Sequence, residues 1–312
     1  MKLLLGNEAV AAGAIAGGVT FFAGYPLAAT SEIHLAFFRS LQSPGAAVVA
    51  EDTDSAVAAA LGAGAGGGLG ATALAGPTLG AAEELVLYGT DFRIPALIAV
   101  LGGRSDFSER MESAEQGAAS RLRLHRAGSP LPPVWVPASS ADCYALAKAA
   151  AHEAVARSAP VLLYLDDVIA HLREPVLLPV GSGDAEATTA DSPPSSPEPV
   201  ELYRTRDATV IVVAFGIVAR AARTAVRLAR EQGLRAGLFR PVRLWPFPVA
   251  ELEAAVGRER AILVAELNDG QVWEAIAARG SAGARGSVRS LAESREGMLT
   301  PARILAAIRE AA

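Results

Sequence analysis

The sequence predicts an α/β fold made of two doubly wound, mostly parallel sheets. Apolar stretches typical of buried strands alternate with helical stretches along most of the 312 residues, which is the pattern of sheets covered by helices on both faces. Hydrophobic residues make up 51% of the chain and charged residues 20%, so large cores can be filled. A chain of this length favours two domains over one.

The first domain is expected over residues 1–180. Its predicted strands are the short apolar runs "VTFFAGYP", "AAVVAE", "GATALAG", "PALIAVLG", "PPVWVPAS" and "APVLLYLDD". Its predicted helices cover 6–17, 30–42, 54–66, 79–92 and 140–158. In the helix over 30–42, the apolar residues Ile33, Phe37, Phe38 and Leu41 lie on one side. Thr30 or Ser31 is expected to cap that helix.

A linker is predicted over residues 181–199, because serine, proline and acidic residues are abundant there and large apolar residues are absent. The second domain is expected over residues 200–312, where the alternation resumes. Its predicted strands are "ATVIVVAFG", "LRAGLFRPV" and "AILVAEL", and its predicted helices cover 217–232, 249–257 and 271–280. A last helix is expected to begin with Thr300 as cap and Pro301 as first residue.

Composition argues against several classes of function. The net charge is 28 − 33 = −5 and no basic stripe occurs, which does not favour a nucleic-acid partner. Cys143 is the only cysteine, so this chain alone holds neither an internal disulfide nor a cluster with four thiolate ligands. The four histidines lack the spacing of metal ligands, and no metal site is predicted.

Two apolar stretches are not expected to target or cross a membrane. Asn7 and Glu8 interrupt the apolar N-terminus, unlike the run of a signal peptide. The uncharged stretch 55–82 is rich in glycine and alanine and contains Pro77, which favours a closely packed interior over a membrane span. We therefore expect a cytoplasmic protein without membrane association.

Three segments of the first domain follow consecutive predicted strands. They are "GYPLAATSE" (24–32), Glu51 at the end of "AAVVAE", and "AGPT" (75–78). Each alone fits a turn or a helix start, although Asp52 and Asp54 already supply the acidic groups that a helix start favours. Because the carboxyl ends of parallel strands meet at one edge, the three together predict a ligand-binding cleft.

Three further motifs are weaker. "GAGAGG" (62–67) follows a helix and precedes a strand, which is the reverse of a dinucleotide-binding motif. Cys143 and His152 are nine residues apart on one helix and face opposite sides, so they do not predict a nucleophilic pair. Arg240 in "GLFRPVRLWPFP" leaves two interpretations open: a rigid domain corner, or a side chain that holds a carboxylate or a partner chain.

Several strings resemble the α subunit of 2-oxoacid:ferredoxin oxidoreductases, and the similarity is closer to the branch that acts on 2-oxoglutarate and branched-chain oxoacids. They are "GNEAVAAGAIAGGVTFFAGYP…SE", "AED", "AEQG", "AFGIVARAARTAV", "LFRPVRLWPFP" and "AELNDGQ". Together they cover nearly the whole chain apart from the linker. The resemblance implies a pyrimidine-binding domain for thiamine pyrophosphate, followed by a transketolase-C-like domain.

The resemblance also implies an enzyme that is active only with a second chain. In this family a β subunit carries the pyrophosphate and Mg²⁺ site and usually an iron–sulfur cluster. The implied reaction is the oxidative decarboxylation of a 2-oxoacid, with ferredoxin or a similar acceptor and with coenzyme A taking the acyl group. A dimer of αβ heterodimers is expected. The single cysteine and the missing GDG…N magnesium motif agree with this division.

The resemblance assigns roles to individual residues. Glu51 aligns with the family's catalytic glutamate, which contacts N1′ of the cofactor's aminopyrimidine ring. Further cofactor contacts are expected from Tyr25, Pro26, Gly76, Pro77 and Thr78. Substrate contacts are expected from Ala28, Ala29, Thr30 and Arg104.

Several of these positions depart from the family pattern. Where the family reads close to GYPITPSSE, Ala28 replaces the threonine that meets the substrate and Ala29 replaces a proline. Thr78 replaces a glycine of SGPG, and Arg104 follows Gly103, the position at which the family has its arginine. These changes lie where the substrate would bind, and they favour an altered substrate.

Two other functions stay open at this point. The first is a non-oxidative decarboxylase or carboligase subunit on the same scaffold, which a partner chain without iron–sulfur clusters would favour. The second is a structural subunit without catalysis, against which the retained Glu51 argues.

Overall fold

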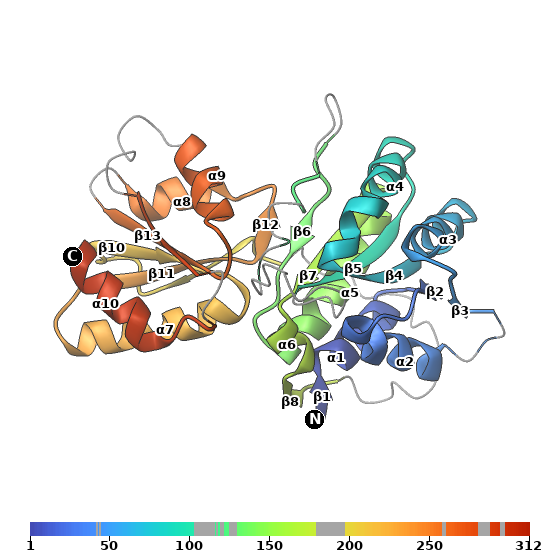
Figure 1. Ribbon diagram of the computed structural model, residues 1–312, viewed down its shortest axis with the longest axis horizontal. Coiled ribbons are helices and arrows are strands. Elements are labelled where there is room, and N and C mark those ends of the chain that lie inside the picture. The colour runs from blue at the N-terminus through green and yellow to red at the C-terminus, as the bar shows by residue number, and fades with distance from the viewer. Residues whose placement is uncertain are drawn as a thin grey trace.

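The computed structural model describes residues 1–41, 43, 45–102, 116, 118, 122–124, 130–178, 197–257, 260–279, 288–293 and 297–312. It confirms the α/β class, since Figure 1 shows two main sheets that each have helices on both faces. The segment predicted as a linker lies outside the described residues except for 197–199.

The first main sheet has seven strands in the order β12-β6-β7-β5-β4-β2-β3. Its strands are β2 (Phe21–Gly24), β3 (Ala47–Val49), β4 (Gly70–Ala75), β5 (Ala96–Leu101), β6 (Val134–Trp135), β7 (Pro160–Leu165) and β12 (Arg243–Trp245). The six strands from the N-terminal half pair in parallel, as predicted. The seventh, β12, comes from the C-terminal half and pairs antiparallel with β6, which the sequence did not predict.

Helices cover both faces of this sheet. One face is covered by α1 (Gly6–Ala16), α2 (Ser31–Ser40) and α5 (Ser140–Arg157), and the other by α3 (Thr53–Ala65) and α4 (Leu79–Asp91). The small residues of α1 allow it to lie directly against α5. A Cβ atom at Gly13 would lie only 2.2 Å from the Tyr144 carbonyl oxygen.

The second main sheet has five strands in the order β14-β13-β10-β11-β9. They are β9 (Val200–Tyr203), β10 (Val210–Val213), β11 (Ala236–Pro241), β13 (Ala261–Glu266) and β14 (Val288–Ala292). Helices α7 (Gly216–Glu231) and α10 (Pro301–Ala311) pack on one face, and α8 (Val249–Val256) and α9 (Gln271–Arg279) on the other. The predicted cap of the last helix is confirmed, because the Thr300 hydroxyl accepts the Arg303 amide at 3.3 Å.

The two halves of the chain share one hydrophobic core. The face of the first sheet that carries α3 and α4 contributes Ile98 and Tyr164, and the C-terminal half contributes Phe239 and Trp245 to the same cluster. All four side chains are at most 1% exposed. This continuous core fixes the two sheets relative to each other, so residues of both halves meet at their junction.

Some local predictions need correction. The helix predicted over 30–42 covers Ser31–Ser40, and the three residues before it form a 3₁₀ turn, Ala28–Thr30. Thr30 is the residue before the helix, yet its side chain makes no capping hydrogen bond. The reason is that its hydroxyl is already bonded to Leu27 within the turn.

A small two-stranded sheet was also missed. It pairs β1 (Lys2–Leu5) antiparallel with β8 (Arg173–Val176), and the short helix α6 (Asp167–His171) precedes β8. The two strands are far apart in the sequence, so no local pattern indicates their pairing.

Candidate functional site at the carboxyl edge of the first sheet

The three segments predicted to line a cleft lie at neighbouring strand ends. Strand β2 pairs in parallel with both β3 and β4, so the three strands end at the same edge of the sheet. The loop over 25–30 follows β2, Glu51 follows β3, and the 3₁₀ turn Gly76–Thr78 follows β4. The predicted adjacency is confirmed, and this edge is where open α/β sheets bind their ligands.

Glu51 is exposed at this edge and does not cap the next helix. Asp52 does so instead, because its Oδ1 atom accepts the Ser55 amide at 2.7 Å. Hydrogen bonds from Ser55 also lower the pKa of Asp52. One residue before Glu51, the Ala50 amide donates to the Gly24 carbonyl at 3.0 Å and ties the ends of β3 and β2 together. Glu51 is thus held at a fixed place with an exposed side chain.

The loop after β2 is closed by its own hydrogen bonds. Tyr25, Pro26 and Ala28 are exposed, and Ala29 is half-buried. Thr30 is fully buried. Its hydroxyl accepts the Leu27 amide and donates to the Leu27 carbonyl, both at 3.3 Å. Thr30 therefore holds the loop together, and its contact with a substrate stays a prediction.

The turn after β4 is tightly packed. A Cβ atom at Gly76 would lie 2.9 Å from the Ala118 Cβ atom, so a glycine suits this buried position. The Thr78 hydroxyl donates to the Ala75 carbonyl at 2.9 Å. Pro77 and Thr78 are both half-buried. Their contacts with a cofactor stay predictions, and Gly103 and Arg104 lie outside the described residues.

A histidine connects the start of α2 with α6. His171 Nε2 lies 3.4 Å from a Glu32 carboxylate oxygen, and its Nδ1 lies 3.2 Å from Asp167 Oδ1. The hydrogen bond with the Asp167 side chain is the largest cause that raises the pKa of His171 from 6.5 to about 9. A charged imidazolium thus links the helix that follows the loop over 25–30 to the end of α6.

This link predicts a pH dependence of stability. Because the folded-state pKa of His171 is raised, its contribution is fully present below about pH 6.5 and is lost as pH rises through about 9. The melting temperature of His171→Gln should therefore differ most from wild type at pH 6 and converge with it by pH 10. His152→Gln is the control, because burial lowers the pKa of His152, so its contribution changes only as pH falls towards and below about 6.5 and not between about pH 8 and 10, where that of His171 is lost. A constant difference for His171→Gln across the range would contradict the assignment.

Two buried polar residues that sequence reasoning missed join the halves of the chain. Asp166 follows β7, and its Oδ2 atom accepts the Ile217 amide of α7 at 2.6 Å. The Gln116 side chain donates to the Phe215 carbonyl and accepts the Leu267 amide, both at 3.0 Å. Gln116 belongs to the string "AEQG" and Leu267 to "AELNDGQ". These strings therefore mark a junction between the two sheets.

Arg240 belongs to the same junction. It is 8% exposed and pairs with Asp142 at 2.5 Å and with Glu201 at 2.8 Å. Asp142 lies on α5 of the N-terminal half, and Glu201 lies on β9 beside β11. The segment "GLFRPVRLWPFP" thus combines parts of both interpretations. It forms a corner between the halves of the chain, and Arg240 holds two carboxylates of its own chain.

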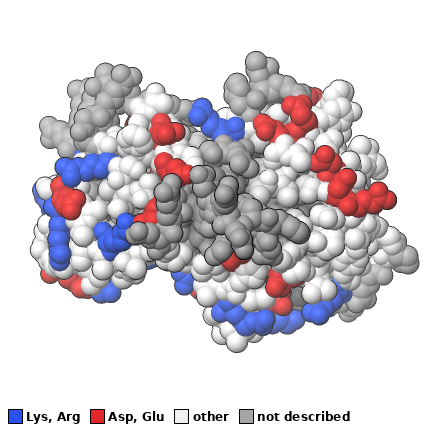
Figure 2. Space-filling view, viewed as in Figure 1, with Lys and Arg blue, Asp and Glu red and all other residues white. Residues whose placement is uncertain are grey.

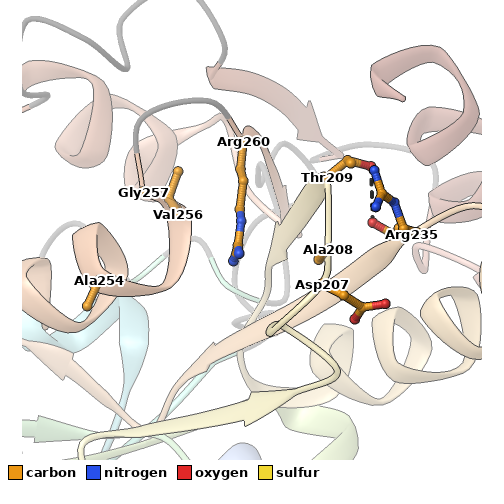
Figure 3. Close-up of a pocket in the computed structure, with 8 residues that line it drawn as sticks. All are labelled: Asp207, Ala208, Thr209, Arg235, Ala254, Val256, Gly257 and Arg260. Carbon is orange, nitrogen blue, oxygen red and sulfur yellow. Dashed lines mark hydrogen bonds between the residues drawn. The ribbon is translucent and has the colours of Figure 1, made fainter.

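A hollow of about 540 Å³ lies at the edge of the second sheet where its parallel strands begin. Thr209, Arg235, Val256 and Arg260 line it (Figure 3). Two of its charged side chains, those of Arg260 and Asp207, bond to other parts of the same chain. Arg260 donates to the backbone carbonyls of Thr205, Arg206 and Ala255. The carboxylate of Asp207 is paired with Arg230. These hydrogen bonds and this ion pair hold neighbouring backbone segments in place, so the hollow does not resemble a reaction site.

Acidic side chains gather on the side of the molecule that carries α3 and α4, and basic side chains gather mainly over the second sheet and along the lower rim in Figure 2. Within the described residues, no helix has the length and apolar character needed to cross a membrane. The same part of the chain contains no group of three or more metal-ligating side chains. Cys143 is fully buried, and burial raises the pKa of its thiol.

Two protein families match this chain. The family described as "Pyruvate flavodoxin/ferredoxin oxidoreductase, thiamine diP-bdg" matches residues 12–214, and "Pyruvate:ferredoxin oxidoreductase core domain II" matches residues 208–297. Among curated proteins, 2-oxoglutarate synthase subunit KorA of Methanothermobacter marburgensis is 27% identical over 86% of this chain and 88% of its own length. The KorA subunit of Archaeoglobus fulgidus is 29% identical over 87% of this chain and 89% of its own length.

Solved structures share the fold. A 2-oxoglutarate:ferredoxin oxidoreductase from Magnetococcus marinus superposes with a TM-score of 0.83 at 21% identity, and the match covers 99% of this chain and 65% of that chain. A split gene transketolase superposes with a TM-score of 0.66 at 16% identity and covers 99% of this chain and 98% of that chain.

Proposed function

Because this chain belongs to the thiamine diphosphate-binding family of pyruvate flavodoxin/ferredoxin oxidoreductases, we propose that it is the α subunit of a 2-oxoacid:ferredoxin oxidoreductase. The resemblance seen in the sequence is confirmed at the level of the family. The reaction is the oxidative decarboxylation of a 2-oxoacid, in which ferredoxin or a similar protein accepts electrons and coenzyme A accepts the acyl group. The named relatives, 2-oxoglutarate synthase and ketoisovalerate oxidoreductase subunits, support this substrate class.

The observation that carries the proposal is the exposed carboxylate of Glu51 after the edge strand β3, next to the loop that follows β2. The 3₁₀ turns Ala28–Thr30 and Gly76–Thr78 themselves contain no charged side chain. In this proposal an aminopyrimidine ring binds at this edge, where Glu51 supplies the carboxylate for its N1′ atom. When bound, thiamine diphosphate supplies the group that adds to the substrate carbonyl and accepts the electrons released on loss of CO₂. The role of the Glu51 carboxylate is to hold or share a proton at N1′ of the ring.

A second subunit completes the site in this proposal. It carries the pyrophosphate and Mg²⁺ site and an iron–sulfur cluster, since the single cysteine of this chain cannot supply four thiolates. The names of the relatives, which are subunits, support a multi-subunit enzyme. We further propose a dimer of αβ heterodimers that works in the cytoplasm, with domains over 1–180 and 200–312.

The substrate is proposed to differ from that of the named relatives. Ala28 is exposed at the loop expected to meet the substrate, and it offers no hydroxyl there. The same hypothesis holds that Ala29, Thr78 and Arg104, the other positions that depart from the family pattern, also change the contacts with the substrate. A smaller set of polar contacts favours a substrate that is less dependent on hydrogen bonds to its carboxylate.

The test is an assay of the complex purified with its partner subunit. We expect 2-oxoacid-dependent reduction of methyl viologen or ferredoxin that requires thiamine diphosphate, Mg²⁺ and coenzyme A. A panel of pyruvate, 2-oxoglutarate and branched-chain oxoacids separates the two claims. Brisk turnover with one of these acids would contradict the altered substrate, and release of CO₂ without reduction of any acceptor would favour the non-oxidative alternative. A complex that binds thiamine diphosphate and reacts with no 2-oxoacid would overturn the proposal.

A further inference from the structure

The ring of His34 lies beneath the end of strand β2. His34 is on the first turn of α2 and is 5% exposed. It packs edge-to-face on Phe22, with ring centroids 5.2 Å apart. Its Nε2 atom lies so close to Gly24 that a Cβ atom added there would be 2.3 Å away. Glycine at position 24 is therefore required to make room for the imidazole.

His34 acts by shape and not by charge. Its buried Nε2 atom has no hydrogen-bond partner within the described part of the chain. Burial also lowers the pKa of His34 to about 4, so the imidazole is neutral at physiological pH. A buried nitrogen without a partner is unfavourable, and a wholly apolar side chain would fill this space without that cost. The contact with Gly24 is therefore the feature that distinguishes His34 from an ordinary core residue.

Gly24 is connected directly to the proposed catalytic carboxylate. The Gly24 carbonyl accepts the Ala50 amide at 3.0 Å. Ala50 is the residue before Glu51, and it lies after the last residue of β3. Within the described residues, strand β3 is the last strand of the sheet and pairs with β2 alone. The position of Glu51 thus depends on the position of the Gly24 carbonyl.

We infer that His34 is a positioning residue for Glu51, which it supports through Gly24 and Ala50. The inference rests on the proposed function in one respect, the catalytic role of Glu51. His34 is buried, so in this inference it acts through Gly24 and not on a substrate or cofactor itself. The imidazole determines the position of the Gly24 carbonyl at the end of β2, and this carbonyl holds the backbone next to Glu51.

The inference is tested with a cycle of variants in the full chain bound to its partner. Gly24→Ala places a methyl group against Nε2 and should displace the strand end. His34→Ala removes the support, and the double variant removes the clash with the imidazole, which leaves the Phe22 ring, 2.8 Å from the added Cβ atom, as the neighbour that must still shift. Gly62→Ala is the matched control, because a Cβ atom there meets nothing within 4 Å.

Hydrogen exchange of the Ala50 amide measures the position of the strand end without any assay of activity. We expect exchange to accelerate by about tenfold or more in Gly24→Ala and by less in His34→Ala. Exchange in the double variant should return towards the wild-type rate, and exchange in Gly62→Ala should equal the wild-type rate. In the assay of the complex, kcat should fall by about tenfold or more in Gly24→Ala with little change in KM, and it should recover in the double variant.

The outcomes separate this inference from the proposed function. Unchanged exchange of the Ala50 amide in both single variants, or a double variant no better than Gly24→Ala, would overturn the role of His34. If exchange of the Ala50 amide follows the expected pattern across the variants but the wild-type complex reacts with no 2-oxoacid, the link from His34 to Glu51 is upheld and the proposed function is overturned.

Discussion

Replacing Glu51 by glutamine should reduce 2-oxoacid-dependent turnover by about 100- to 10,000-fold, the usual contribution of a positioned acid or base. Glutamine has the same length as glutamate and stays at the same place on the edge, but it cannot hold the proton at N1′ in the same way. Because the Glu51 side chain is exposed, the free energy of unfolding should change by less than about 0.5 kcal/mol. Viologen reduction and co-purification with the partner measure the two effects.

Asp52→Asn is the matched control for this experiment. It removes one negative charge a single residue away, and asparagine caps a helix about as well as aspartate. The Asp52 cap on the Ser55 amide should therefore survive, and turnover should stay near that of wild type. If Glu51→Gln retains full turnover, or if Asp52→Asn loses as much, the assignment of Glu51 is wrong.

Arg240→Met should destabilise the folded chain by about 2–3 kcal/mol. Removing one partner of a buried ion pair typically costs about 3–5 kcal/mol. The side chains of Asp142 and Glu201 are 33% and 35% exposed, which lowers the expected loss because water compensates part of it. Methionine keeps the apolar stem, so the measured change reports the lost ion pairs together with the hydrogen bond from Arg240 to the Val136 carbonyl. The midpoint of urea unfolding measures the effect.

Arg227→Met is the control for the ion pairs of Arg240. Arg227 pairs with Glu231 on α7, where both side chains are more than half exposed. Removing such an exposed pair should cost about 0.5 kcal/mol or less. Equal losses in the two variants would show that the pair of Arg240 with Asp142 does not stabilise the junction between the halves of the chain.

Features encoded in local stretches were predictable from the sequence. The alternation of apolar runs and helical spacing indicated the parallel sheets, because each run could be assigned from its own residues. The same holds for Thr300 and Pro301, whose side chains act within one helical turn. At the candidate site, the adjacency of the three strand ends followed from the parallel order of the sheet.

Features that depend on contacts between distant segments were not predictable from local patterns. Strand β12 pairs with β6 across about a hundred residues, and Asp166 accepts the Ile217 amide at the start of a helix in the other half. Thr30 shows the same limit on a smaller scale. A capping role was expected from its type and position, but the 3₁₀ turn before it engages its hydroxyl. The burial of His34 against Gly24 likewise depends on how α2 packs on β2.

A structure of the purified complex with thiamine diphosphate bound tests the central claim most directly. The account predicts that N1′ of the aminopyrimidine lies about 2.6–3.2 Å from a Glu51 carboxylate oxygen, within hydrogen-bond reach. It also predicts that the loop over 25–30 and the turn Gly76–Thr78 flank the ring. A ring bound at another edge of the chain, or one whose N1′ meets a different carboxylate, would contradict the account.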